Sequence, residues 1–170
     1  MTNKRIERLR NRLLESGRPT QFPRAVQAEA TPELSALADR VRPFAEVMYL
    51  VLAADTEITE RERDLLRGTL RTLTEGALSS TTMDGMLKAF ERDRARDGVE
   101  LRLDYLASSL YPDRSDARLA IGLATAAADA DRGIGPEERE LIQSLGERLG
   151  ISRRELQELF HDTSPTAETR

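Results

Sequence analysis

The chain carries ADTEITERER at residues 54–63 and, 76 residues later, ADRGIGPEER at residues 130–139. Aligning the two segments on Ile58 and Ile134 needs no gap. The identical pairs are then Ala54/Ala130, Asp55/Asp131, Ile58/Ile134, Glu62/Glu138, Arg63/Arg139, Leu65/Leu141 and Leu73/Leu149. A repeat at one fixed spacing is typical of a duplicated supersecondary unit. It predicts a domain built from two pseudo-symmetric halves.

Each copy has the features of a turn between two helices. Thr59 followed by Glu62 is the pattern of a capping box, in which each side chain bonds the backbone N–H of the other residue. In the second copy, Pro136 stands at the first helical position and Glu138 at the third. The isoleucine before each cap is expected to hold the turn against the core.

Apolar residues recur at helical spacing along most of the chain, and no segment alternates as a strand does. We expect an all-α fold, with a single compact helical domain of about seven helices plus a leading N-terminal helix. Pro43 should break or restart the first helix of the domain, and Asp97-Gly98 should interrupt the helix that begins near Thr82. Ser115 is expected to cap a central helix, whose alanines and Gly122 allow a neighbour to approach closely.

The distribution of proline, charge and apolar residues divides the chain into four segments. Residues 1–16 are predicted to form a basic amphipathic helix and residues 17–31 a proline-containing linker. The helical domain is expected over 32–161, followed by a disordered tail over 162–170. The apolar stripe and arginines of the leading helix offer a route to peripheral membrane association.

Composition excludes several classes of function. The chain has no cysteine, which removes disulfides, thiol catalysis and Cys-ligated metal sites, and its one histidine, His161, is expected to face solvent. A net charge of −4 and only 4% aromatic residues argue against a nucleic-acid partner. No apolar run reaches the ~20 residues that a membrane span needs. Nearly all basic residues are arginine, as in GC-rich genomes, so we expect a bacterial source. With no cysteine for disulfides and no secretory leader in the sequence, we expect a cytoplasmic protein.

The run AADADRGIGPEER at residues 127–139, continued by LGIS at 149–152, resembles the tellurite-resistance TerB family. A weaker form of the pattern occurs at residues 53–66. The resemblance implies an all-helical fold of two pseudo-symmetric halves over roughly residues 31–160. It also implies divalent-cation binding through the acidic turns, a place in tellurite and stress resistance, and protein partners, without enzymatic activity. The family glycine after the aspartate is replaced by Thr56 and Arg132.

Carboxylates gathered in both turns are candidate ligands for a hard divalent cation such as Ca²⁺, Mg²⁺ or Mn²⁺. The second copy is not an EF-hand, because Ile134 directly follows Gly133 and Arg139 stands where that loop has its bidentate glutamate. An alternative interpretation is purely structural: the glutamates cap the helices, and Asp55 and Asp131 are typical of Asx-type turns. The two interpretations are compatible, and after capping Asp55, Asp129 and Asp131 remain as the first residues to consider for a ligand. The candidate metal ligands are Asp55, Glu57, Glu62, Asp129, Asp131 and Glu138.

The leading hypothesis is a non-enzymatic TerB-like protein that binds a divalent cation, a protein partner or both through its acidic turns. The first alternative is a metal-free scaffold or adaptor, and the second is a hydrolase whose two turns face each other around bound metal. The alternating charges of residues 91–97 predict a solvated helix face without a further role.

Overall fold

The computed structural model describes residues 31–55, 57–130 and 133–161. Within these ranges the chain forms six helices and no strand, which confirms the predicted all-α class. The helices are α2 (Pro32–Leu52), α3 (Glu60–Leu73), α4 (Ser80–Leu110), α5 (Arg114–Ala128), α6 (Pro136–Arg148) and α7 (Arg153–His161). The expected helix at 1–16, the tail at 162–170 and the linker at 17–31, except for Thr31, lie outside the described residues. Thr31 is the N-cap of α2. The pseudo-symmetry of the two halves stays a prediction.

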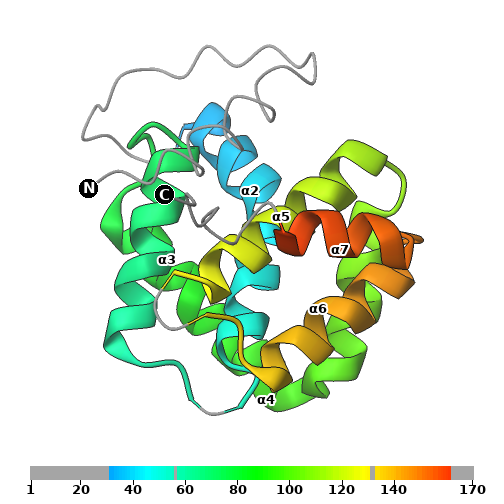
Figure 1. The fold of residues 1–170 in the computed structure, drawn as a ribbon. Coiled ribbons are helices and arrows are strands. Elements are labelled where there is room, and N and C mark those ends of the chain that lie inside the picture. Colours follow the sequence, from blue (N-terminus) through cyan, green and yellow to red (C-terminus); the bar gives the residue numbers. More distant parts are fainter. Residues whose placement is uncertain (1–30, 56, 131–132, 162–170) are drawn as a thin grey trace, which may run out of the picture.

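Helices α2 and α5 form the centre of the bundle, with α3 on one side and α6 and α7 on the other (Figure 1). The prediction of a central alanine-rich helix is confirmed, because every residue of α5 from Leu119 to Ala128 is buried. Its small side chains leave room for α2, whose C-terminal half is buried from Phe44 to Leu52. One continuous apolar core therefore joins the helices.

The predicted break at Pro43 is wrong, since α2 runs through it from Pro32 to Leu52. Proline inside a helix removes one hydrogen bond and costs about 3 kcal/mol. The group that loses its hydrogen-bond donor is the backbone carbonyl of Asp39. Because Asp39 is exposed, water can donate to this carbonyl instead. The buried residues on the C-terminal side keep the helix continuous, because each large apolar side chain contributes roughly 1.5–3 kcal/mol on burial.

The predicted interruption at Asp97-Gly98 is confirmed as a kink within α4. Gly98 has φ 78° and ψ 165°, a conformation open essentially to glycine, so two helical segments meet there at an angle. Two predicted helix starts need correction. Ser79, rather than a residue near Thr82, is the N-cap of α4. Asp113, rather than Ser115, is the N-cap of α5, and its carboxylate accepts a hydrogen bond from the Ser115 backbone N–H at 2.8 Å.

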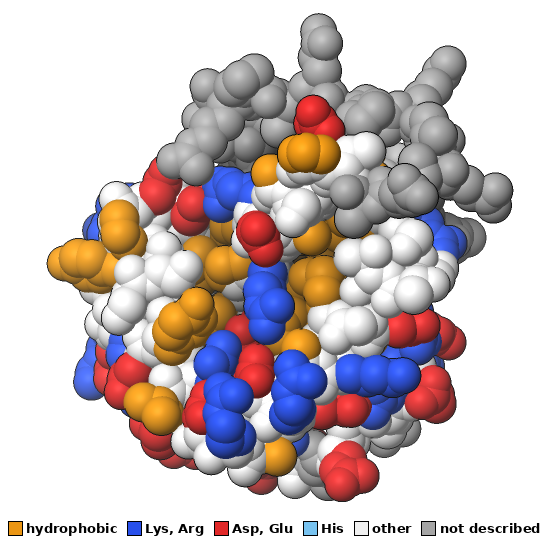
Figure 2. Space-filling view, turned by 180° about the vertical axis from the view of Figure 1, so that it is seen from behind, with side chains coloured by type: hydrophobic (Ala, Val, Ile, Leu, Met, Phe, Trp, Pro, Cys, Tyr) orange, Lys and Arg blue, Asp and Glu red, His pale blue; other side chains and the backbone are white. Residues whose placement is uncertain are grey.

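A buried ion pair fastens the kinked helix to α2. Glu46 is 2% exposed and accepts two hydrogen bonds from Arg102, at 2.7 and 2.9 Å. Nearby, Arg42 forms a second ion pair with Asp93, at 3.5 Å. Seen from behind, the molecule carries interleaved basic and acidic side chains over its lower half, with hydrophobic side chains among them (Figure 2). In the part of the chain that the structure describes, no helix is long and apolar enough to cross a membrane.

Candidate functional site

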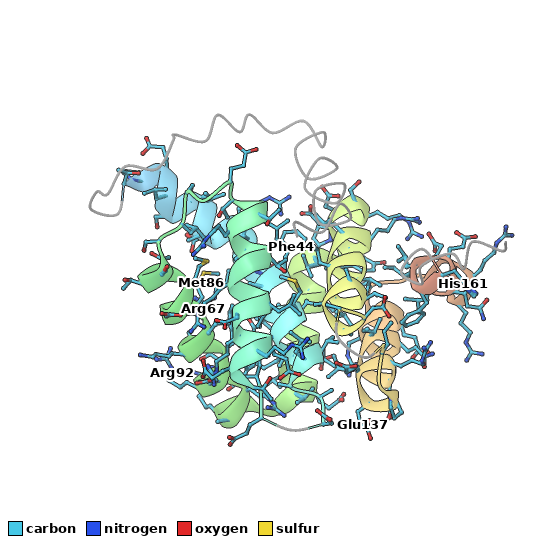
Figure 3. All side chains as sticks on the ribbon, turned by 60° about the vertical axis from the view of Figure 1, so that its left-hand side comes forward. Phe44, Arg67, Met86, Arg92, Glu137 and His161 are labelled. Carbon is cyan, nitrogen blue, oxygen red and sulfur yellow. The ribbon has the colours of Figure 1, made fainter. Side chains whose placement is uncertain are left out.

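The two acidic turns lie at the same end of the bundle, where α3 and α6 begin (Figures 1 and 3). They line one cavity of about 520 Å³. The walls comprise Leu52, Asp55, Thr59, Arg61, Glu62 and Leu65 around the first turn, and Ala127, Ala128, Gly133, Gly135 and Glu138 around the second. Carboxylates 76 residues apart in the sequence therefore face a common space.

Local capping sets the geometry of the first turn. Ile58 is buried in the core and fixes the chain where it enters α3. The Glu62 N–H donates to Thr59 Oγ1 at 3.3 Å, and the Thr59 N–H donates to Glu62 Oε2 at 2.7 Å. The predicted capping box is confirmed, and it aims the Glu62 carboxylate at the start of the helix.

The second turn also places a capping glutamate at the start of its helix, but with different residues around it. Gly133 has φ 80°, which a side chain would disfavour, and Pro136 occupies the first position of α6. The Gly135 N–H donates to Glu138 Oε2 at 2.7 Å, so this glutamate also caps its helix as predicted. Thr56 and Arg132, which stand where the TerB pattern has a glycine, lie outside the described residues.

The ionised form of Glu138 is disfavoured by its surroundings in the cavity. Burial raises the pKa of Glu138, and the carboxylates of Asp55, Glu62 and Glu137 raise it further, against the lowering effect of the Gly135 hydrogen bond. Two of these carboxylates belong to the first turn, so the turns interact electrostatically across the cavity. Arg61 brings one positive charge to the same walls.

The six predicted ligands do not form one cluster. Asp55, Glu62 and Glu138 line the shared cavity, whereas Glu57 lines a second cavity on the other side of the first turn. Asp129 is the C-cap of α5, and Asp131 lies outside the described residues.

Direct metal coordination by these residues stays a prediction. Within residues 31–55, 57–130 and 133–161, no group of three acidic or histidine side chains is close enough to hold a metal ion. The hydrolase hypothesis needs facing turns and a two-metal ligand set. The shared cavity meets the first condition, and the described carboxylates do not meet the second.

Sequence reasoning missed the second cavity, which measures about 400 Å³ between α2, α3 and α4. The predicted solvated face over residues 91–97 is wrong in its middle, because Asp93 is only 7% exposed and Arg94 is part-buried. Extending the apolar stripe of Met83, Leu87 and Phe90 by one helical turn would have placed both residues on the packed side. His161 is exposed on the outside of α7, as predicted (Figure 3).

Comparisons of the sequence with protein-family models, with curated proteins and with solved structures find no match. The likeness to TerB proteins therefore rests on the residues of the acidic turns.

Proposed function

We propose that this chain is a non-enzymatic, TerB-like protein that binds a divalent cation in the cavity between its two acidic turns. The observation that carries the proposal is the convergence of Asp55, Glu62 and Glu138 on one cavity of about 520 Å³. These residues come from both copies of the repeat, and the packing of α3 and α6 places them on the walls of one cavity.

A bound cation would favour the ionised form of Glu138, which its surroundings disfavour. Its carboxylate is half-buried and faces other carboxylates, and both effects favour the protonated form. Hard cations such as Ca²⁺, Mg²⁺ and Mn²⁺ prefer oxygen ligands, and Mg²⁺ in particular retains several waters beside one or two carboxylates. Water ligands therefore make up for the small number of described carboxylates at the site.

Capping and cation binding are compatible in the same glutamates. The caps use Oε2 of Glu62 and Oε2 of Glu138. An ionised carboxylate has two oxygens and about four lone-pair sites, so a capped glutamate keeps acceptor capacity for a cation.

Titration calorimetry with Ca²⁺, Mg²⁺ and Mn²⁺ tests this proposal. Glutamine preserves an N3 cap and removes the charge, so Glu138→Gln separates the two roles of the residue. We expect micromolar binding by the wild type and at least about tenfold weaker binding by Glu138→Gln. Glu140→Gln is the matched control, since Glu140 is an exposed residue of the same helix. Absence of heat and of any thermal shift at millimolar cation would overturn the proposal.

The cellular role that fits is bacterial stress or tellurite resistance, which the resemblance to TerB proteins implies. The test is growth of the native host on tellurite after deletion of the gene. We expect sensitivity that the wild-type gene reverses and the Glu138→Gln gene does not. Full rescue by Glu138→Gln would separate resistance from cation binding.

A metal-free adaptor is the second candidate, favoured by exposed aromatic side chains on and beside α4. Tyr105 and Tyr111 are 60% and 64% exposed, and Leu101 lies one turn before Tyr105. Exposed tyrosines of this kind are enriched at protein interfaces. In EDTA, a partner retained by Glu138→Gln and lost on Tyr105→Ser would favour the adaptor. Loss of the partner in Glu138→Gln would instead indicate that the partner binds at the acidic turns.

A further inference from the structure

The second cavity differs from the first in its charges, because two arginines and two glutamates line it, whereas three carboxylates and one arginine line the first. It lies between α2, α3 and α4, on the side of the first acidic turn where Glu57 and Ile58 form its wall. We propose that this cavity binds a small molecule through a carboxylate or phosphate oxyanion held by Arg94. The proposal does not depend on cation binding, because none of the residues lining this cavity lines the shared cavity between the turns.

Arg94 is a part-buried guanidinium whose described hydrogen bond goes to a neutral group. Its Nη2 donates to the Ala53 carbonyl at 2.8 Å, and Tyr49 lines the same cavity. Among the described residues, no carboxylate lies within 4.0 Å of its charged nitrogens, whereas Arg92 and Arg96 on the same helix both pair with acids.

The Ala53 carbonyl only partly balances the charge of Arg94. This carbonyl belongs to the C-cap of α2, and a helix C-terminus carries about half an elementary negative charge. A guanidinium has five N–H donors in a planar fork, and the bond to Ala53 uses one of them. The remaining donors and the unbalanced charge suit an oxyanion, which forms charge-assisted hydrogen bonds with arginine.

Tyr49 supplies a second donor beside Arg94. Its side chain is 2% exposed, and its ring packs against Phe90 with the centroids 5.8 Å apart. Burial raises the pKa of Tyr49, so the hydroxyl stays protonated at neutral pH and can donate to a bound oxygen. The rigid placement of the ring on the core fixes the direction of that donor.

The other charged residues limit the ligand to one anionic group. Arg63 pairs with Glu91 across α3 and α4, which neutralises both charges within the cavity wall. Glu57 is exposed at the rim and repels a second negative charge. The remainder of the ligand is therefore neutral or positively charged, as in an amino acid. A volume of about 400 Å³ falls in the size range of small-molecule sites.

An NMR titration of the full ¹⁵N-labelled chain in EDTA tests the proposal. The probes are sodium acetate, glycine and inorganic phosphate, each raised to ~50 mM at constant ionic strength with sodium chloride as the reference. We expect saturable shifts of the amides at residues 53–58 and 91–95, with a Kd of about 10 mM or tighter for at least one probe. A response to acetate or glycine alone identifies a carboxylate ligand, and a response to phosphate alone identifies a phosphate ester.

Three variants assign the binding to Arg94 and Tyr49. Arg94→Gln keeps a donor for Ala53 and removes the charge, and it should weaken binding at least tenfold. Tyr49→Phe keeps the ring on Phe90 and should weaken binding without changing the fold. Arg92→Gln, on an exposed position of α4, should bind as the wild type does. The proposal is overturned if the wild type shows no saturable shift with any probe, if the shifts map elsewhere, or if Arg94→Gln binds unchanged.

Discussion

Replacing Glu46 by glutamine should destabilise the domain far more than the loss of a surface ion pair. Glu46 is 2% exposed, and both of its oxygens accept from Arg102, at 2.7 and 2.9 Å. Glutamine has nearly the same shape, but it offers one acceptor and turns an NH₂ group toward the guanidinium. Arg102 would then keep a buried positive charge without its main partner.

The expected cost follows from the remaining contacts of Arg102. Breaking a buried ion pair on one side costs about 3–5 kcal/mol. Arg102 Nη1 also lies 3.3 Å from Asp97 Oδ2, and this second carboxylate places the cost near the lower end, at about 3 kcal/mol. With an m-value of about 2 kcal/mol per molar urea, the urea midpoint should fall by roughly 1.5 M.

A double variant distinguishes lost charge pairing from lost packing. Buried ion pairs replaced by apolar residues of similar volume are often as stable as the original pair. We therefore expect Glu46→Leu combined with Arg102→Met to recover most of the stability lost in Glu46→Gln. The comparison is urea unfolding of all variants, followed by circular dichroism at the helix band.

Arg154 and Glu158 provide the matched control for this experiment. Their side chains are 88% and 56% exposed and lie 3.2 Å apart, so Glu158→Gln should change the free energy of unfolding by less than about 0.5 kcal/mol. The reasoning fails if Glu46→Gln shifts the midpoint no more than this control. It also fails if the double variant is as unstable as the single one.

Two further predictions concern the kink of α4 and the start of α7. Gly98→Ala should cost about 1–3 kcal/mol because φ is 78° there, whereas Gly85→Ala, with open space around it in the same helix, should gain about 0.5–1 kcal/mol. Urea unfolding must give opposite signs for the two, and equal signs would refute the conformational argument. Hydrogen bonds from Ser152 and Arg114 lower the pKa of Glu155 from 4.5 to about 2. The resulting stabilisation is fully present above pH ~4.5 and is lost as the pH falls toward 2, so the urea midpoint of Glu155→Gln should fall less over this range than that of the wild type. Equal acid sensitivity of the two proteins would contradict this assignment.

Features fixed by neighbouring residues could be predicted from the sequence. The caps at Thr59 and at Gly135-Pro136 could be predicted because donor and acceptor lie within three residues of each other. The kink at Gly98 was found for the same reason, since a glycine after an aspartate marks an interruption without reference to any distant residue.

Features fixed by distant packing could not be predicted in this way. Pro43 lies within a continuous helix because the residues that follow it are buried against α5. In the sequence Arg94 is one charge among several, and its hydrogen bond to Ala53 depends on where the end of α2 lies, 41 residues earlier in the chain. The shared cavity likewise depends on where α3 and α6 lie, and a local repeat does not specify that.

The meeting of the two turns creates an excess of negative charge that capping does not remove. Leu52 and Ala128 line one cavity, so α2 and α5 end together and α3 and α6 begin together, each with a capping glutamate. Helix N-termini stabilise carboxylates, yet burial and the facing acids still raise the pKa of Glu138. A carboxyl group whose pKa is raised in the folded state stabilises the protein less as the pH rises through that range. Ionised Glu138 therefore destabilises the metal-free protein at neutral pH.

In EDTA at neutral pH, Glu138→Gln should therefore unfold at the same or a higher urea concentration than the wild type. Saturating divalent cation should reverse this order, since only the wild type gains binding energy in the folded state. A variant less stable than the wild type in EDTA would mean that the glutamate acts as a cap and carries no excess charge.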